Sequence, residues 1–109
     1  DGVAVTEKGK ILLVKTDEII ENSFDYAKVN NELYVSSRLQ GDKITLKNRG
    51  ITKTLKKLFN ELGIPAEERD SIAVVHDGEN VVWVEGIGVN AQYIPDDNSK
   101  NIVVIIKEG

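Results

Sequence analysis

The first half of the chain consists of short apolar runs separated by residues that favour turns. The run KILLVK at 10–15 has the length and composition of a strand. Two further runs, 24–29 and 33–37, flank Asn30-Asn31, and because asparagine tolerates positive φ we expect them to form a hairpin. The segment KITLK at 43–47 alternates polar and apolar residues, so it predicts a strand with one face on the core.

Residues 52–62 have the periodicity of an amphipathic helix. Apolar residues recur there at helical spacing and fall on one side: Leu55, Leu58, Phe59 and Leu62. Thr52 can cap the start of this helix, and Gly63 stands where a left-handed residue commonly ends one. Pro65 prevents continuation and favours a short second helical turn through Glu68.

The second half of the chain returns to strands. We expect strands at 71–75 and 81–84 around an Asp77-Gly78 turn, a third at 91–94, and a last one at 102–106. Strands and helices do not alternate regularly, which argues against a doubly wound fold. The pattern predicts one α+β domain, residues 1–109, with a mostly antiparallel sheet and one main amphipathic helix, residues 52–62.

The composition is that of a globular domain, with 40% hydrophobic and 29% charged residues among 109. The chain has no cysteine, which excludes disulfides, thiolate zinc sites and cysteine nucleophiles. No apolar run reaches the roughly 20 residues of a membrane span and no signal peptide opens the chain, so we expect a cytoplasmic protein without a membrane partner. The chain also lacks methionine and begins with Asp1, so we expect it to be part of a longer protein.

Cationic residues are concentrated in one window, although the net charge of the chain is −4. Seven of them stand against a single acid, Asp42: Arg38, Lys43, Lys47, Arg49, Lys53, Lys56 and Lys57. On a helix over 52–62, three lysines would gather opposite the apolar stripe, where like charges repel by a few tenths of a kcal/mol per pair. A phosphate backbone is the natural partner for such a stripe, and an ordinary solvated face is the alternative.

The sequence shows no constellation of catalytic or metal-binding residues. Residues 86–91 match GxGxxA, but a dinucleotide fold needs a helix directly afterwards, and Pro95 interrupts the segment that follows. His76 is the only histidine, so we expect a structural or exposed role for it rather than a metal site. Trp83 is expected in the core, with stacking on a nucleic-acid base as the alternative. Because nucleophile and phosphate-loop motifs are also absent, we expect no catalytic residue, no metal and no cofactor in this chain.

Several motifs occur in a fixed order between positions 37 and 88. They are SRLQGDKI (37–44), GITKTLKKLFNELGIP (50–65), ERD (68–70) and HDGENVVWVEGIG (76–88). This order resembles the C-terminal domain of tRNA(Ile)-lysidine synthetases: an R-x-x-G-D turn, a glycine, a lysine-rich helix, an I-P step, an arginine, and a D-G hairpin leading to W-V-x-G. Two positions depart from that pattern, because Thr54 stands where the family helix often has lysine and Ala73 where proline is common.

The resemblance implies a sandwich-like α+β fold and a parent enzyme whose chemistry lies outside this chain. The family enzyme is an ATP-dependent ligase that joins lysine to the wobble cytidine of an isoleucine tRNA, forming a C–N bond. Its catalytic N-terminal domain carries an SGGxDS loop, which this chain lacks. ATP and Mg are therefore implied for the parent alone. The implied partners are tRNA, at its acceptor stem, and the N-terminal domain of the same chain, with a homodimer of the parent left open.

The resemblance also assigns residue roles. Arg38 belongs to the R-x-x-G-D turn and faces RNA together with the lysines of the window, Lys53, Lys56 and Lys57 above all. Structural roles fall to Gly41, Asp42, Gly50, Pro65, Arg69 and Trp83. Asp42 would pair with Arg38, and Gly50 would permit the bend into the helix. Arg69 would brace a turn, with contact to RNA as the alternative. The alternative is a protein-interaction or self-assembly domain without direct RNA contact.

Overall fold

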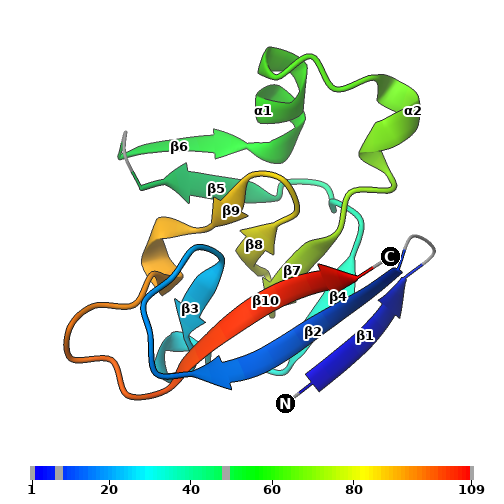
Figure 1. Ribbon diagram of the computed structural model, residues 1–109. Helices are drawn as coiled ribbons and strands as arrows, with labels where there is room; N and C mark the ends of the chain where they lie inside the picture. Colours follow the sequence, from blue (N-terminus) through cyan, green and yellow to red (C-terminus); the bar gives the residue numbers. More distant parts are fainter. Residues whose placement is uncertain (1, 7–8, 48–49, 109) are drawn as a thin grey trace.

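The computed structural model describes residues 2–6, 9–47 and 50–108 (Figure 1). One sheet has the strand order β1-β2-β10-β3, with bounds Gly2–Thr6, Gly9–Thr16, Ile102–Glu108 and Ser23–Asp25. Another has the order β4-β7-β8-β9, with bounds Leu33–Ser36, Val74–Asp77, Asn80–Val84 and Gly88–Val89. A separate hairpin joins β5 (Lys43–Leu46) to β6 (Ile51–Thr54). The helical segments are η1 (Tyr26–Lys28), α1 (Leu55–Glu61), α2 (Ala66–Arg69) and η2 (Ala91–Tyr93).

The strand pairings among these residues are antiparallel, which confirms the predicted α+β class. Helix α1 is the longer of the two α-helices, although it is shorter than predicted. In the described part of the chain, no helix is long and apolar enough to cross a membrane.

The β7–β8 hairpin is buried on both faces. On one face Val75 and Trp83 pack in a cluster with residues of the β1-β2-β10-β3 sheet, which include Ile11, Phe24, Val103 and Ile105. On the other face Val74 and Val84 pack in a second cluster with residues of β5 and α1: Ile44, Leu55, Leu58 and Phe59. Figure 1 shows the same order, with β2 and β10 on one side of β7 and β8 and α1 on the other. The fold is therefore a two-sheet sandwich, as the resemblance implied, with α1 and the β5–β6 hairpin as a third layer.

A register shift in the β7–β8 pair allows residues of β8 to pack into both hydrophobic clusters. Val75 pairs with Trp83, whereas the next residue, His76, pairs with Val81. Val82 is therefore skipped in the ladder, and it lies with its neighbour Trp83 in the sandwich cluster. A bulge of this kind places two consecutive side chains on one side of a strand.

Helix α1 starts at Leu55, so the predicted start at Thr52 was wrong. Residues 51–54 form β6 instead, where Thr52 lies opposite Thr45. β-Branched residues at three of these four positions favour a strand once β5 is available as a partner. The cap is Thr54, whose hydroxyl accepts the backbone N–H of Lys57 at 3.2 Å. The other end agrees with the prediction, since Gly63 has φ +69° just after the helix.

The predicted hairpin of 24–29 with 33–37 was also wrong. Strand β3 pairs with β10 and strand β4 pairs with β7, so the two segments lie in different sheets. The strand expected at 71–75 is β7, Val74–Asp77. Residues 91–94, expected as a strand, contain η2. Local patterns indicated extended backbone correctly in most of these places but could not select the partner strand.

A buried carboxylate explains why Asn30-Asn31 does not turn a hairpin. Asp77, at the end of β7, is fully buried and accepts the backbone N–H of Asn30 and of Asn31, the latter at 2.6 Å. It also accepts the Tyr93 hydroxyl at 2.9 Å, which ties η2 to the same point. Burial by itself raises the pKa of Asp77, but these hydrogen bonds outweigh it and hold the pKa below the ordinary value of an aspartate. Burial and the Asp77 carboxylate raise the pKa of Tyr93.

We expect Asp77→Asn to lower the free energy of unfolding at neutral pH by roughly 2–4 kcal/mol, because an amide cannot replace a carboxylate that accepts several donors. The lowered pKa means that the stability from Asp77 is present above the pKa of the unfolded chain and is lost as the pH falls through the folded value. Urea unfolding at pH 6 and pH 3 should show a larger loss in the native protein than in Asp77→Asn. Equal losses would contradict this assignment, and Asp97→Asn in the exposed 96–101 loop is the control.

Candidate nucleic-acid interface

The β5–β6 hairpin carries the first lysines of the cationic window, on opposite faces. Its register pairs Lys43 with Thr54 and Ile44 with Lys53. Residues directly opposite in an antiparallel pair point to the same side. Lys43 therefore shares one face with Thr45 and the threonines of β6, whereas Lys53 lies on the face of the buried Ile44.

Lys53 was predicted on the helix, beside Lys56 and Lys57, and this placement was wrong. Lys53 belongs to β6, and its ammonium group forms an ion pair with the Glu61 carboxylate at the end of α1. The Lys53 side chain is only 16% exposed. Its charge is therefore largely offset within the domain.

Lys56 and Lys57 are exposed in the first turn of α1. That turn contains no acidic residue, and the positive end of the helix dipole opposes cations there. Within the described residues, neither lysine forms an ion pair. The electrostatics of the first helical turn therefore do not favour these two lysines.

Arg38 lies between β4 and β5 and reaches toward α1. Its guanidinium carbon is 5.7 Å from the centroid of the buried Phe59 ring, a cation–π distance. The expected pairing of Arg38 with Asp42 is wrong, because the Asp42 carboxylate accepts the Leu39 backbone N–H at 2.8 Å and contacts His76 instead. Stacking on the ring leaves the donors at the rim of the guanidinium for other acceptors.

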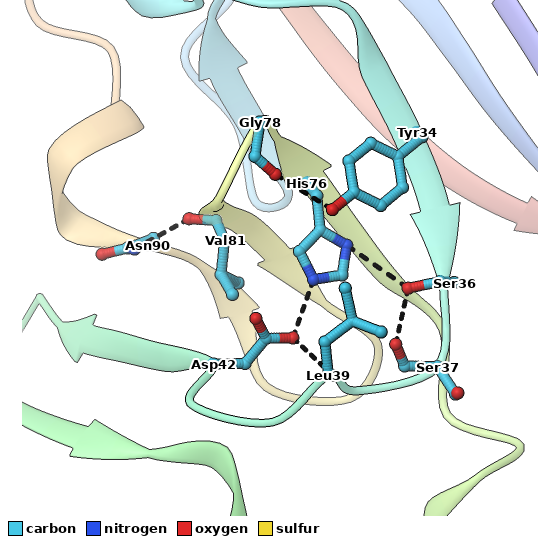
Figure 2. A network of polar contacts seen from close by, with 9 residues as sticks. All are labelled: Tyr34, Ser36, Ser37, Leu39, Asp42, His76, Gly78, Val81 and Asn90. Atoms are coloured by element: carbon cyan, nitrogen blue, oxygen red, sulfur yellow. Dashed lines mark hydrogen bonds and ion pairs between the residues drawn. The ribbon is translucent and has the colours of Figure 1, made fainter.

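The turn after Arg38 is held by a buried imidazole (Figure 2). His76 Nε2 lies 2.7 Å from Asp42 Oδ2, and both side chains are almost wholly buried. Tyr34 stacks on the imidazole with the ring centroids 4.7 Å apart. A structural role was one of the two expected for His76, and the structure adds that this residue fastens the Leu39–Asp42 turn to β7.

Ser36 completes a serine–histidine–aspartate alignment that the sequence analysis missed. Its hydroxyl lies 3.5 Å from His76 Nδ1 but donates to the Ser37 carbonyl at 2.6 Å (Figure 2). A nucleophilic serine needs a base that is aligned to take its proton, and here the proton points away from the imidazole. The alignment is therefore a packing feature, and the described residues also contain no group of three side chains able to hold a metal.

A family model described as the TilS substrate C-terminal domain matches residues 33–106. This chain belongs to the TilS C-terminal domain family. The chain is 39% identical to the tRNA(Ile)-lysidine synthase of Caldanaerobacter subterraneus subsp. tengcongensis over 82 residues, which are 75% of the chain and 18% of that relative. For the tRNA(Ile)-lysidine synthase of Clostridioides difficile the identity is 38%, over 75% of the chain and 17% of the relative.

The fold agrees with this membership. A crystal structure of a TilS C-terminal domain superposes with a TM-score of 0.77 and 27% identity, covering 97% of this chain and 88% of the other. The chain spans less than a fifth of the length of the two synthases.

Other motif residues of this TilS C-terminal domain lie at turns and in the core. Gly41 and Gly50 have φ of +85° and +59°, values that favour glycine. Arg69 Nε donates to the Ile64 carbonyl at 2.9 Å, next to Pro65 at the start of α2. Trp83 is buried and its indole N–H donates to Asn22 at 3.0 Å. Lys47 is exposed just after β5, and Arg49 lies outside the described residues.

The cap at Thr54 positions the two exposed lysines of α1, and a matched pair of substitutions tests it. Thr54→Val should lower the free energy of unfolding by about 1 kcal/mol, because valine cannot accept the Lys57 N–H. Thr52→Val, which also removes a hydroxyl from β6 and with it an exposed hydrogen bond to Thr45, should stay within about 0.5 kcal/mol, because water replaces the lost partner of Thr45. Chemical denaturation measures both. If Thr52→Val lowers the free energy of unfolding more than Thr54→Val does, the helix begins at Thr52, as its periodicity predicted, and not after Thr54.

Proposed function

We propose that this chain is the tRNA-gripping domain of a tRNA(Ile)-lysidine synthase and that it binds the acceptor stem without catalysing. The observation that carries the proposal is the pair of exposed lysines, Lys56 and Lys57, in a helical turn that does not favour cations. A bound phosphate backbone would offset that unfavourable charge.

Further cations extend this surface. Lys43 and Lys47 are exposed at the two ends of β5, and Arg38 is stacked on Phe59 beside α1. The rest of the chain is acidic enough to make the net charge −4. A local positive field in an acidic protein directs a polyanion to one surface rather than to the whole molecule. Arg49, outside the described residues, stays a predicted member of the proposed set, and the partly neutralised Lys53 is a weaker one.

Catalysis is proposed for the part of the parent protein outside this chain. The parent would be an ATP-dependent ligase that forms the C–N bond of lysidine in the cytoplasm, using ATP and Mg held by its catalytic N-terminal domain. The present chain would contribute grip on the acceptor stem of isoleucine tRNA.

A protein-interaction role is the second candidate, and a groove of mixed polar and apolar lining with several exposed apolar side chains favours it. Exposed Ile19 and Ile20 of the loop after β2 and exposed Leu62 at the end of α1 line this groove together with Ile87. Such a patch suits contact with another domain of the parent or with a second copy. Sedimentation at high concentration tests self-association, because a chain that stays monomeric would count against a homodimer formed by this groove.

We expect the double substitution Lys56→Glu, Lys57→Glu to lower the affinity for isoleucine tRNA by at least roughly tenfold at low salt, because two phosphate contacts become repulsive. The slope of log affinity against log salt should decrease by about 1.5, since each lost contact releases one counterion fewer. Filter binding or fluorescence anisotropy over a salt series measures both quantities.

The control reverses the same number of charges away from the proposed surface. Lys10→Glu, Lys100→Glu changes exposed residues of β2 and the 96–101 loop and should alter affinity far less. If both double variants lose affinity equally, net charge alone explains binding. If neither does, tRNA does not contact α1.

A further inference from the structure

A narrow polar groove runs beside Lys43, between the β5–β6 hairpin and the end of the β7–β8 hairpin. Lys43, Thr45 and Thr52 line one wall, and Glu79, Asn80 and Gln92 line the other. The lining is therefore almost entirely hydroxyl, amide and charged groups. The groove takes up one face of the hairpin that supplies Lys43 to the proposed tRNA surface.

The floor of this groove is rigid because Asn90 fixes it. The buried Asn90 amide donates to the Val81 carbonyl at 2.8 Å (Figure 2) and accepts the Thr45 N–H at 3.1 Å. These bonds attach β5 to β8 directly beneath the groove. The two walls are thus held at a fixed separation before any ligand arrives, which lowers the entropy cost of binding.

The walls present hydrogen-bonding groups that the domain itself does not use up. The hydroxyls of Thr45 and Thr52 share one hydrogen bond at 2.7 Å, which leaves one hydroxyl hydrogen and several lone pairs available. The Gln92 amide is exposed, and no partner contacts it within the described residues. Asn80, in contrast, is engaged with Tyr93.

The charges along the groove select among nucleic-acid groups. Lys43 at one wall attracts a phosphate, whereas the Glu79 carboxylate on the other wall repels one and accepts hydrogen bonds from hydroxyl or amino donors. A phosphate backbone is therefore disfavoured inside the groove. The wide minor groove of A-form RNA displays 2′-hydroxyls and base edges with phosphates only at its borders, which fits this arrangement.

We propose that this groove reads the 2′-hydroxyls of the RNA minor groove through Thr52 and Gln92, so that the domain distinguishes RNA from other polyanions. The inference rests on the proposed tRNA grip and adds a specificity site to it. The lysines of α1 contact phosphates and therefore bind nucleic acids with any sugar equally well, whereas the groove favours sugars that carry a 2′-hydroxyl.

The test compares two duplexes with the acceptor-stem sequence of an isoleucine tRNA, one of ordinary RNA and one with 2′-fluoro sugars. The fluoro sugar keeps A-form geometry but removes the hydroxyl donor. We expect the native chain to bind the RNA duplex roughly tenfold more tightly, as lost hydrogen bonds at more than one sugar predict. The variant Thr52→Val, Gln92→Ala should reduce that ratio to about one while its affinity for the fluoro duplex stays unchanged.

Two controls separate this inference from the proposed function. Asn98→Ala, an exposed amide in the 96–101 loop, should leave both affinities unchanged, and Lys56→Glu, Lys57→Glu should weaken both duplexes equally without altering the ratio. The inference would be wrong if the native chain bound the RNA and 2′-fluoro duplexes equally well, or if Thr52→Val, Gln92→Ala kept the native preference for RNA. Either result would leave the proposed phosphate contacts unaffected. Binding to neither duplex at low salt would overturn the proposed function and the inference together.

Discussion

Strands β7 and β8 are covered by other parts of the protein on both faces, and the rest of the fold depends on this burial. Packing covers both sides of these strands, so each buried polar side chain on them must find a partner inside the protein. His76 contacts Asp42, and Asp77 binds the 30–31 backbone and Tyr93. Among the described residues, no buried polar side-chain atom lacks a hydrogen-bond partner. Each of these bonds fastens a distant segment to the hairpin.

The position of the cationic surface follows from these attachments. The Asp42–His76 contact holds the turn between Arg38 and Lys43, and Asn90 holds the backbone of Thr45. Ile44, from the same strand, is buried in the cluster beneath α1. The strand that carries Lys43 is therefore fixed by polar bonds on one side and by apolar packing on the other. Cations on such a support lose little backbone entropy when they bind a phosphate.

The sequence allowed us to predict the features that depend on residues close together along the chain. The alternation of residues 43–47, the left-handed Gly63 and three residues of the α1 stripe depend on residues within one or two turns of each other, and they occur as predicted. Leu62, the fourth residue of the predicted stripe, was placed wrongly, because it follows the end of α1 and is 56% exposed. The concentration of cations was equally visible. Long-range partners were not visible, because Asp77 binds Asn31 across 46 positions and His76 binds Asp42 across 34.

The start of α1 shows why such partners matter for the site. Thr52 and Thr54 have the same capping chemistry, and only the register with β5 decides which of them precedes the helix. That choice also moved Lys53 from the helix surface into an ion pair with Glu61. Arg38 likewise lies over the Phe59 ring and does not pair with Asp42. Composition therefore located the charged segment, but tertiary pairing decided which of its charges face solvent.

The two departures from the family pattern have local physical consequences in this chain. A lysine at position 54 would add a cation beside Lys56 and Lys57 but would remove the hydroxyl that caps α1. A proline at position 73 would lack the N–H that Ala73 donates to the Glu85 carboxylate at 3.0 Å, and Glu85 also pairs with Lys107 of β10. In both places the residue present in this chain takes part in a hydrogen bond that lysine or proline could not make. The proposed contact with a polyanion therefore depends on Lys56 and Lys57, because the capped helix presents two cations in its first turn where a lysine at position 54 would add a third directly before it.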